Sequence, residues 1–386
     1  MASDPPRAET LRKFDVMSEH SLLALEEAKA AGRKVVGIYC VFAPKELVRA
    51  VGAIPVGLCG KKEDPIPAAE KTLPANLCPL IKSSYGYAVT DTCPFNHRAD
   101  FVIGETTCDG KKKMYELLAR VKPVYLMHMP HRQDDAASLA YWQEEVGRLK
   151  EYLERQTGQE ITPEELSRQI RLHNRKRRLL QELVSLNTGE VLPITARDTL
   201  LVMESKSYAA DLEAYVALLE ELIAELRDMQ ARGAAAVPAG APRVLFTGCP
   251  IGKGSEKLLA VLEEAGAAVV AQEHCSGIKA FHHLVDEEGD PLEALARRYL
   301  ATPCSCMTPN RPRLELLADL AQEFRAQGAV DLTWQFCHTY NVEAQLVKEH
   351  LRETRDLPVL HLESDYSQAD REQLRVRVEA FLEMLA

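Results

Sequence analysis

The ten cysteines of this 386-residue chain are the side chains most suited to chemistry, and they form two groups of five. One group lies between residues 40 and 108 and the other between residues 249 and 337. Several of them stand at or near the end of an apolar, β-branched run, as do Cys40, Cys108, Cys249, Cys275 and Cys337. Open α/β sheets bind their ligands at the carboxyl ends of parallel strands. We therefore expect the two groups to converge on one centre of thiolate chemistry.

Three cysteines stand directly before a proline, in the pairs Cys78-Pro79, Cys93-Pro94 and Cys249-Pro250. Proline is favoured in the first turn of a helix, where its missing N–H is not needed. A thiolate there faces free backbone N–H groups and the positive end of the helix dipole, which lower its pKa and stabilise bound sulfur. We expect all three thiols at helix starts. Iron–sulfur clusters use such Cys-Pro steps as well.

The spacing of the cysteines favours an iron–sulfur cluster over zinc. Structural zinc sites bring their ligands in close Cys-x-x-Cys or His-x-x-x-His pairs, whereas the one close pair here is Cys304-Ser305-Cys306. Widely spaced thiols from several loops suit a deep-seated cluster better. For any single cysteine the alternative is a buried, inert residue, since free cysteines are among the most often buried types.

The histidines His282, His283 and His338 are further possible metal ligands. His338 follows Cys337 and could donate a hydrogen bond to a cluster sulfur. For the His282-His283 pair we favour ordinary loop histidines. No catalytic triad can be inferred from the sequence, and the catalytic residues stay unassigned.

Two other segments have more than one interpretation. Gly248–Ser255 resembles a phosphate loop, but only three residues separate Gly248 from the Gly252-Lys253 pair, where the motif needs four. We predict no nucleotide site there, although a helix start close to an anion stays possible. Lys111–Lys113 could be a solvated helix face, or could offset an anionic cluster or dock an acidic partner.

Composition narrows the setting. A net charge of -10 and a pI near 5.7 argue against a nucleic-acid partner, which needs a concentrated basic face. The first ten residues lack the apolar centre of a signal peptide, and no apolar run approaches the length of a membrane span. We expect a cytoplasmic protein, in which thiols are more often reduced, metal-bound or catalytic than paired in disulfides.

The hydrophobic pattern predicts an α/β protein with two doubly wound parallel-sheet domains and a helical section between them. Thr162-Pro163 is a strong helix start, and residues 373–385 predict a closing amphipathic helix. We predict a first α/β domain with an N-terminal helix over 1–133, a helical section over 134–232, a linker over 233–242 and a second α/β domain over 243–386. Strands are expected near 35–40, 54–58, 101–106, 123–128, 243–248, 268–273, 330–336 and 358–362.

Three long motifs, Leu73–Tyr85, Glu105–Met114 and Trp334–Glu343, resemble the 2-hydroxyacyl-CoA dehydratase component family, and the resemblance extends over nearly the whole chain. Two more, Glu273–Lys279 and Pro303–Asn310, resemble the branch whose members carry a double-cubane iron–sulfur cluster. The resemblance implies two flavodoxin-like domains, a homodimer, and in each subunit an 8Fe-9S cluster made of two cubanes that share a sulfide. It also implies a separate dimeric ATPase activator with its own 4Fe-4S cluster, which would deliver electrons.

The resemblance also implies a set of ligands. In the dehydratases three cysteines hold one 4Fe-4S cluster, and their motif positions match Cys78, Cys108 and Cys337. A second cubane needs three more thiolates, for which the candidates are Cys40, Cys275, Cys304 and Cys306, with one of the four spare. Cys59, Cys93 and Cys249 fit less well.

Three functions follow as hypotheses from this resemblance. The first is an ATP-dependent, low-potential reductase of small molecules that works with its activator at the double cubane. The second is a 2-hydroxyacyl-CoA dehydratase subunit with a 4Fe-4S cluster, which would need a partner subunit of similar fold and a site for CoA. The third is a cluster-carrying electron-transfer protein without a substrate of its own. The natural substrate cannot be identified from the sequence.

Overall fold

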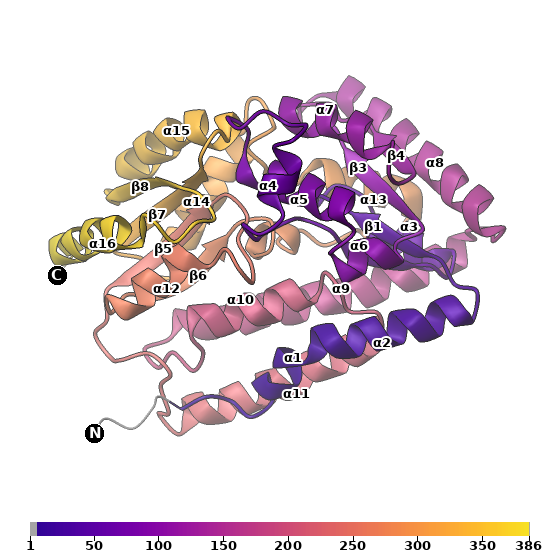
Figure 1. Ribbon diagram of the computed structural model, residues 1–386. Helices are drawn as coiled ribbons and strands as arrows, with labels where there is room; N and C mark the ends of the chain where they lie inside the picture. The colour runs from indigo at the N-terminus through magenta and orange to yellow at the C-terminus, as the bar shows by residue number, and fades with distance from the viewer. Residues whose placement is uncertain (1–5, 386) are drawn as a thin grey trace.

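The computed structural model describes residues 6–385 and contains two parallel sheets of four strands each (Figure 1). The first sheet has the order β2-β1-β3-β4 and the second the equivalent order β6-β5-β7-β8. All six strand pairings are parallel. The strands are β1 (Val35–Ile38), β2 (Ile54–Gly57), β3 (Phe101–Glu105), β4 (Val124–Met127), β5 (Arg243–Gly248), β6 (Ala268–Glu273), β7 (Gly328–Trp334) and β8 (Val359–Ser364).

The strands consist of short apolar runs because helices cover both faces of each parallel sheet, so that both sides of a strand are buried. Every residue of β1, β3, β6 and β7 is buried. The order of both sheets is that of the flavodoxin-like class, with the direction of strand addition reversing between the first and third strands. The α/β class and the two parallel sheets predicted from the sequence are confirmed.

Helices fill the connections of both sheets. The part of the chain that contains the first sheet has α1 (Leu11–Asp15), α2 (Met17–Ala30), α3 (Lys45–Ala50), α4 (Ile66–Ala69), α5 (Pro79–Thr90), α6 (Pro94–Arg98) and α7 (Asp109–Leu118). The part that contains the second sheet has α12 (Lys257–Glu264), the 3-10 turn η2 (Ile278–Ala280), α13 (Pro291–Leu300), α14 (Arg311–Glu323), α15 (His338–Arg355) and α16 (Arg371–Leu385). Of these, α13 packs in the hydrophobic cluster that contains Phe101 and Ile103 of β3. The predicted closing helix is thus confirmed as α16.

Between the two sheets the chain is helical, as predicted. This section contains α8 (Ala136–Thr157), α9 (Pro163–Ser185), the 3-10 turn η1 (Leu186–Thr188), α10 (Ala196–Ser205) and α11 (Leu212–Ala231). The Thr162 side chain caps α9 by accepting a hydrogen bond from the Glu165 amide at 3.2 Å. Figure 1 shows the N-terminal helices α1 and α2 running along α11. Residues 232–242 form neither helix nor strand, and the domain boundaries placed there stay a prediction.

The two sheets share one hydrophobic core. Val102 of β3, Phe246 of β5 and Trp334 of β7 belong to the same continuous cluster of buried residues. Because a shared core resists independent motion of the parts that it joins, the strand ends of both sheets hold fixed positions relative to each other. None of the described helices is long and apolar enough to cross a bilayer.

One of the predicted helix starts is wrong. Cys78 and Cys93 are the N-cap residues of α5 and α6, each followed by proline, as expected. Cys249-Pro250 starts no helix, since the chain continues as a loop until α12 begins at Lys257. Gly248, the last residue of β5, has a φ of +114°, a backbone conformation that glycine tolerates best.

Gly248 gives the first testable prediction. A Cβ atom there would lie 2.1 Å from the carbonyl oxygen of Leu332, in a backbone conformation that L residues avoid. We expect Gly248→Ala to lower the free energy of unfolding by at least ~3 kcal/mol, measured by chemical denaturation. Gly158→Ala is the control, because it also has a positive φ but open space around it, and should cost only about 1–2 kcal/mol. Equal losses in the two variants would contradict the steric account.

Candidate functional site

Eight of the ten cysteines line one cavity of about 220 Å³, which we call the thiol cavity. Both sequence groups contribute to it, so the predicted convergence of the two groups is present in the structure. Four of the eight thiols are buried and the other four are partly exposed. The eight are Cys40, Cys78, Cys108, Cys249, Cys275, Cys304, Cys306 and Cys337.

Strand ends position five of these thiols. Cys40 and Cys108 follow β1 and β3, and Cys249 and Cys337 follow β5 and β7. These are the strands between which each sheet reverses its order, where the loops diverge and leave a crevice. Cys275 follows β6. The cavity is therefore built where the switch points of two sheets meet.

Contacts among the thiols divide them into two sets. Hydrogen bonds from the thiols of Cys249 and Cys78 lower the pKa of Cys337 well below its usual value. Cys275 and Cys306 lower the pKa of Cys304 in the same way. Each set therefore holds one thiolate readily, with two neighbouring thiols as donors.

Cys108 and Cys40 are the two remaining cysteines that line the thiol cavity. Burial raises the pKa of Cys108, and the charge of Cys337 adds to the rise. Burial also raises the pKa of Cys40 to about 12, although the nearby Lys111 opposes that shift. A metal cluster that binds these sulfurs would displace their protons, because the thiolate is the metal ligand.

Positive electrostatics surround the thiol cavity. Cys78, Cys108 and Cys337 are the N-cap residues of α5, α7 and α15, so three helix N-termini point their free N–H groups toward the sulfurs. Lys111 lines the cavity and is buried, with its Nζ donating to the Tyr39 carbonyl at 3.2 Å. An anionic group of buried sulfurs is stabilised by this arrangement.

Lys111 is buried, whereas the next two lysines of the same helix are exposed. The solvated-face interpretation is wrong for Lys111, which is 5% exposed. Lys112 and Lys113 are exposed and pair with Asp109 and Glu116 of their own helix. The helical period explains the division, since the first residue of the run faces the core and the next two face solvent.

The other metal-ligand candidates occupy different places. Cys59 lies outside the thiol cavity and donates to the Tyr39 carbonyl, and Cys93 caps α6 by accepting from the Asn96 amide. His338 is exposed and lines the thiol cavity. His282 and His283 pack on each other with ring centroids 4.5 Å apart and do not line it.

A buried ion network supports the second set of thiols. Arg313 of α14 pairs with Glu273 at the end of β6 and with Glu343 of α15. Asn310 links this network to the thiol loop, because its side-chain amide donates to Glu343 and, at 2.9 Å, to the Cys304 carbonyl. Lys279 pairs with Glu273 at 3.2 Å and donates to the Tyr340 hydroxyl at 2.6 Å. The network fixes the loops that carry Cys275 and Cys304.

The thiol cavity fits a cluster better than a single ion. Within residues 6–385, no three His, Cys, Asp or Glu side chains surround a point where one metal ion would fit. The thiols instead line a volume of about 220 Å³, about seven times the share of one water molecule in the liquid. Sulfur-rich donors around such a volume are the ligand type of iron–sulfur clusters.

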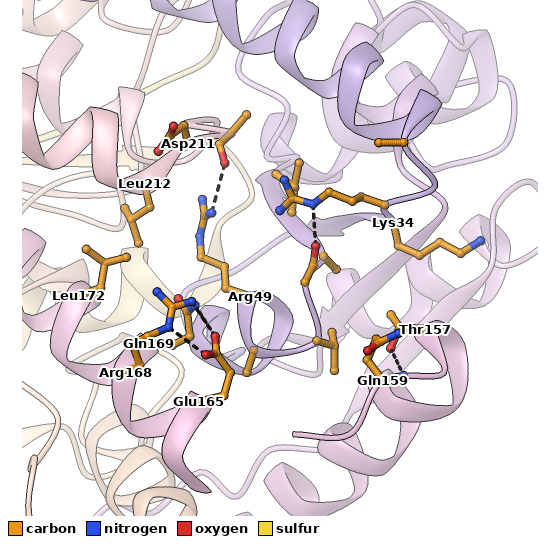
Figure 2. A pocket seen from close by; sticks show the side chains of 18 of the residues that line it. Lys34, Arg49, Thr157, Gln159, Glu165, Arg168, Gln169, Leu172, Asp211 and Leu212 are labelled. Atoms are coloured by element: carbon orange, nitrogen blue, oxygen red, sulfur yellow. Dashed lines mark hydrogen bonds and ion pairs between the residues drawn. The ribbon is translucent and has the colours of Figure 1, made fainter. Parts of the chain in front are cut away.

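A larger open cleft of about 860 Å³ lies elsewhere, between α2, α3, α9 and the start of α11. Figure 2 shows Arg168 against Glu165 of the same helix, whereas Lys34 extends away from the other labelled side chains. Arg49 donates to the carbonyl oxygens of Ala209 and Ala210. No cysteine lines this cleft, so it is remote from the thiol chemistry.

Sequence reasoning missed two features of the site. It did not separate Cys249 from Cys59 and Cys93, although only Cys249 among the three lines the thiol cavity. Its position directly after a β-branched strand was the available signal. It also missed a group of lysines beside the cavity, including the half-buried Lys45 and the buried Lys176, for which no local pattern exists.

The ion network gives the second prediction. Arg313→Met should leave Glu343 buried without a cation and Glu273 with Lys279 alone, and lower the free energy of unfolding by about 3–5 kcal/mol, measured by denaturant titration. Arg311→Met is the matched control on the same helix, because Arg311 is exposed and should contribute less than about 0.5 kcal/mol. A small loss in Arg313→Met would show that the two carboxylates do not depend on this arginine.

Comparisons with known proteins find a family model and relatives that cover most of this chain. Residues 40–385 match the family model described as 2-hydroxyglutaryl-CoA dehydratase, D-component. A protein of Escherichia coli (strain K12) named "Putative dehydratase subunit YjiM" is 43% identical over 375 residues, which cover 96% of this chain and 97% of that protein.

More distant relatives span both dehydration and reduction. The beta subunit of (R)-phenyllactyl-CoA dehydratase from Clostridium sporogenes is 24% identical over 96% of this chain and 97% of its own length. One of the subunits of benzoyl-CoA reductase from Thauera aromatica is 21% identical over 84% of this chain and 83% of its own length.

Proposed function

Because the chain belongs to the 2-hydroxyglutaryl-CoA dehydratase D-component family, we propose that it is an iron–sulfur reductase of the double-cubane branch. It would reduce small molecules at low potential with electrons from a separate ATPase activator. The observation that carries this proposal is the gathering of eight thiols from both sheets around one cavity. A single 4Fe-4S cluster held by three cysteines would leave five of them without a role.

The proposed ligands follow the two sets of thiols. Cys78, Cys108 and Cys337 would hold one cubane, as the motif resemblance implies. Cys275, Cys304 and Cys306, with Cys40 as the fourth candidate, would hold the other. Cys249 is an additional candidate for the first cubane, because it lines the thiol cavity with Cys337 and lowers the pKa of that cysteine. Three thiolates would hold each cubane of the cluster.

The cluster would supply single electrons of low potential when bound. The protein's part is to hold and tune that centre. The N–H groups of three helix N-termini and the buried ammonium of Lys111 face the sulfurs and favour negative charge there. Trp334 and Tyr340, which are 1% and 6% exposed, line the thiol cavity and exclude water from one side.

The second candidate is a dehydratase subunit with a 4Fe-4S cluster. The observation in its favour is that two of the relatives described above are named as dehydratase subunits, and that this chain matches nearly their whole length. This function would use one set of thiols only, and the Cys275 set would then be structural.

The partners that we propose are a second copy of the chain and a dimeric activator with its own 4Fe-4S cluster. ATP would be hydrolysed on the activator. The Gly248–Ser255 segment supports ATP hydrolysis on the activator rather than on this chain. Its Lys253 amide already donates a hydrogen bond to the Glu204 carboxylate at 2.7 Å and is not free for a phosphate.

The third prediction concerns cluster content. Anaerobically purified protein should contain about eight irons per monomer by elemental analysis, with acid-labile sulfide in similar amount. Cys78→Ala and Cys337→Ala should lose half of the iron or all of it, and Cys275→Ala should retain about four. Cys93→Ala is the control, since Cys93 caps a surface helix outside the thiol cavity, and should keep the full content. About four irons in the wild type would instead favour the dehydratase subunit.

The fourth prediction concerns ATP. The purified protein alone should release no phosphate from ATP, whereas reduction of a test substrate should require the activator and ATP together. Phosphate release and substrate loss are measured in the same anaerobic assay. Turnover of ATP by this chain alone, or reduction with a mild donor and no activator, would contradict the proposal.

A further inference from the structure

A second cavity, of about 150 Å³, adjoins the thiol cavity and is lined by an excess of cations. We call it the lysine chamber, after the five lysines that line it. Both cavities are lined by Cys40, Cys275 and Lys111, so they are neighbours. The five lysines are Lys45, Lys61, Lys111, Lys176 and Lys206.

Few of these charges are balanced inside the protein. Arg177 and Arg298 also line the chamber, and Glu204 is its one acidic residue. Glu204 pairs with Lys61 at 2.8 Å. Glu46, which is buried and does not line the chamber, pairs with Arg177 at 2.6 Å. The other five cations of the lining have no carboxylate within ion-pair distance among residues 6–385.

Lys45 and Lys176 stand out, because neither ammonium has a hydrogen-bond or ion-pair partner within the described part of the chain. Lys176 is 8% exposed and projects from α9, and Lys45 is half-buried at the start of α3. Burial lowers the pKa of both, to about 8 for Lys45, and neighbouring cations add to the effect. Buried lysines are normally paired, so two unpaired ones lining the same cavity are costly for the fold.

The remaining cations do not compete for this role. Lys206 donates to the Met203 carbonyl at 2.6 Å and to the Ser276 carbonyl. Arg298 donates to the carbonyls of Ala280 and His283. These groups already have acceptors, so the unsatisfied donors of the chamber are concentrated on Lys45 and Lys176.

From these contacts we infer that the lysine chamber binds a small organic carboxylate, held by Lys45 and Lys176 beside the thiol cavity. The chamber volume equals about five water molecules, which suits a compact acid and is well below the roughly 300–1,000 Å³ of pockets for larger ligands. Tyr39, Leu80 and Phe281 give it an apolar side for the carbon body of such an acid. A CoA thioester would not fit inside it.

An alternative role for the lysines is to offset the charge of a cluster. Lys111 suits that role, because it lines both cavities. Lys45, Lys176 and Lys206 line the chamber and not the thiol cavity, so their charge is directed at a separate volume. The inference rests on the proposed function only in treating the thiol cavity as the redox centre, and it narrows the substrate class of that centre to small carboxylates.

The test is calorimetric titration of the anaerobic holoprotein with succinate, with inorganic phosphate and neutral acetamide as separate probes at constant ionic strength. We expect succinate to bind and acetamide not to bind. Lys176→Met should weaken succinate binding at least about tenfold, because a hydrogen bond to a charged group is worth about that factor or more. Lys45→Met is the second variant, and Lys348→Met is the control, since Lys348 is exposed on α15.

Thermal unfolding gives an independent readout. Without an added anion, Lys176→Met should have a higher Tm than the wild type, because it removes an unpaired buried charge. Succinate should raise the Tm of the wild type and of Lys348→Met but not that of Lys176→Met. This reversal distinguishes a binding lysine from a lysine that only supports the fold.

Each outcome decides the inference separately from the proposed function. Absence of succinate binding, binding of phosphate alone, or equal binding by Lys176→Met and the wild type would overturn the carboxylate site even if the protein held eight irons. Succinate binding by a protein with four irons would support the site and refute the double-cubane reductase.

Discussion

The constraint on which the structure depends is the burial of many thiols and cations in one place. Eight sulfurs around one cavity repel each other when ionised and leave an apolar void when they are not. The fold meets this constraint by bringing the switch points of two sheets together, so that three helix N-termini and a buried lysine face the sulfurs. The shared core, with Phe246 and Trp334 in one cluster, holds the strand ends of the two sheets in fixed positions relative to each other.

The same constraint explains why so much buried charge lies nearby. The Arg313 network and the lysine chamber lie next to the thiol loops, where a low dielectric strengthens both attraction and repulsion. Arg313 is fully paired and contributes to the rigidity of the loops. Lys45 and Lys176 have no partner among residues 6–385, so the protein carries a cost in stability that a ligand would relieve. Such conflicts between stability and local structure are expected at functional sites.

Much of the fold could be predicted from the sequence, because its signals are local. β-Branched runs predicted all eight strands close to their observed bounds, and Thr162-Pro163 predicted the start of α9. The start predicted at Cys249-Pro250 was wrong, because proline is also common in loops and the turn depends on the conformation of Gly248. The convergence of the cysteines was also accessible, since strand ends of parallel sheets share an edge.

The lysine chamber could not be predicted, because its lysines come from α3, α7, α9 and the segments after β2 and α10. No spacing in the sequence relates Lys45 to Lys176. Only the packing of α3 against α9 brings them to one cavity. The division of Lys111 from Lys112 and Lys113 likewise depended on which face of α7 meets the core. Ligand identity among the thiols is a matter of the bound cluster and stays a prediction.

The central claim is that both sets of thiols, the Cys78 set and the Cys275 set, hold one iron–sulfur centre. The most direct measurement is anomalous scattering at the iron edge from a crystal grown without oxygen. The account predicts iron density inside the thiol cavity, in contact with Cys78 and Cys337 on one side and Cys275 and Cys304 on the other. Iron bound only by the Cys78 set, with the Cys275 set left as free thiols, would contradict it.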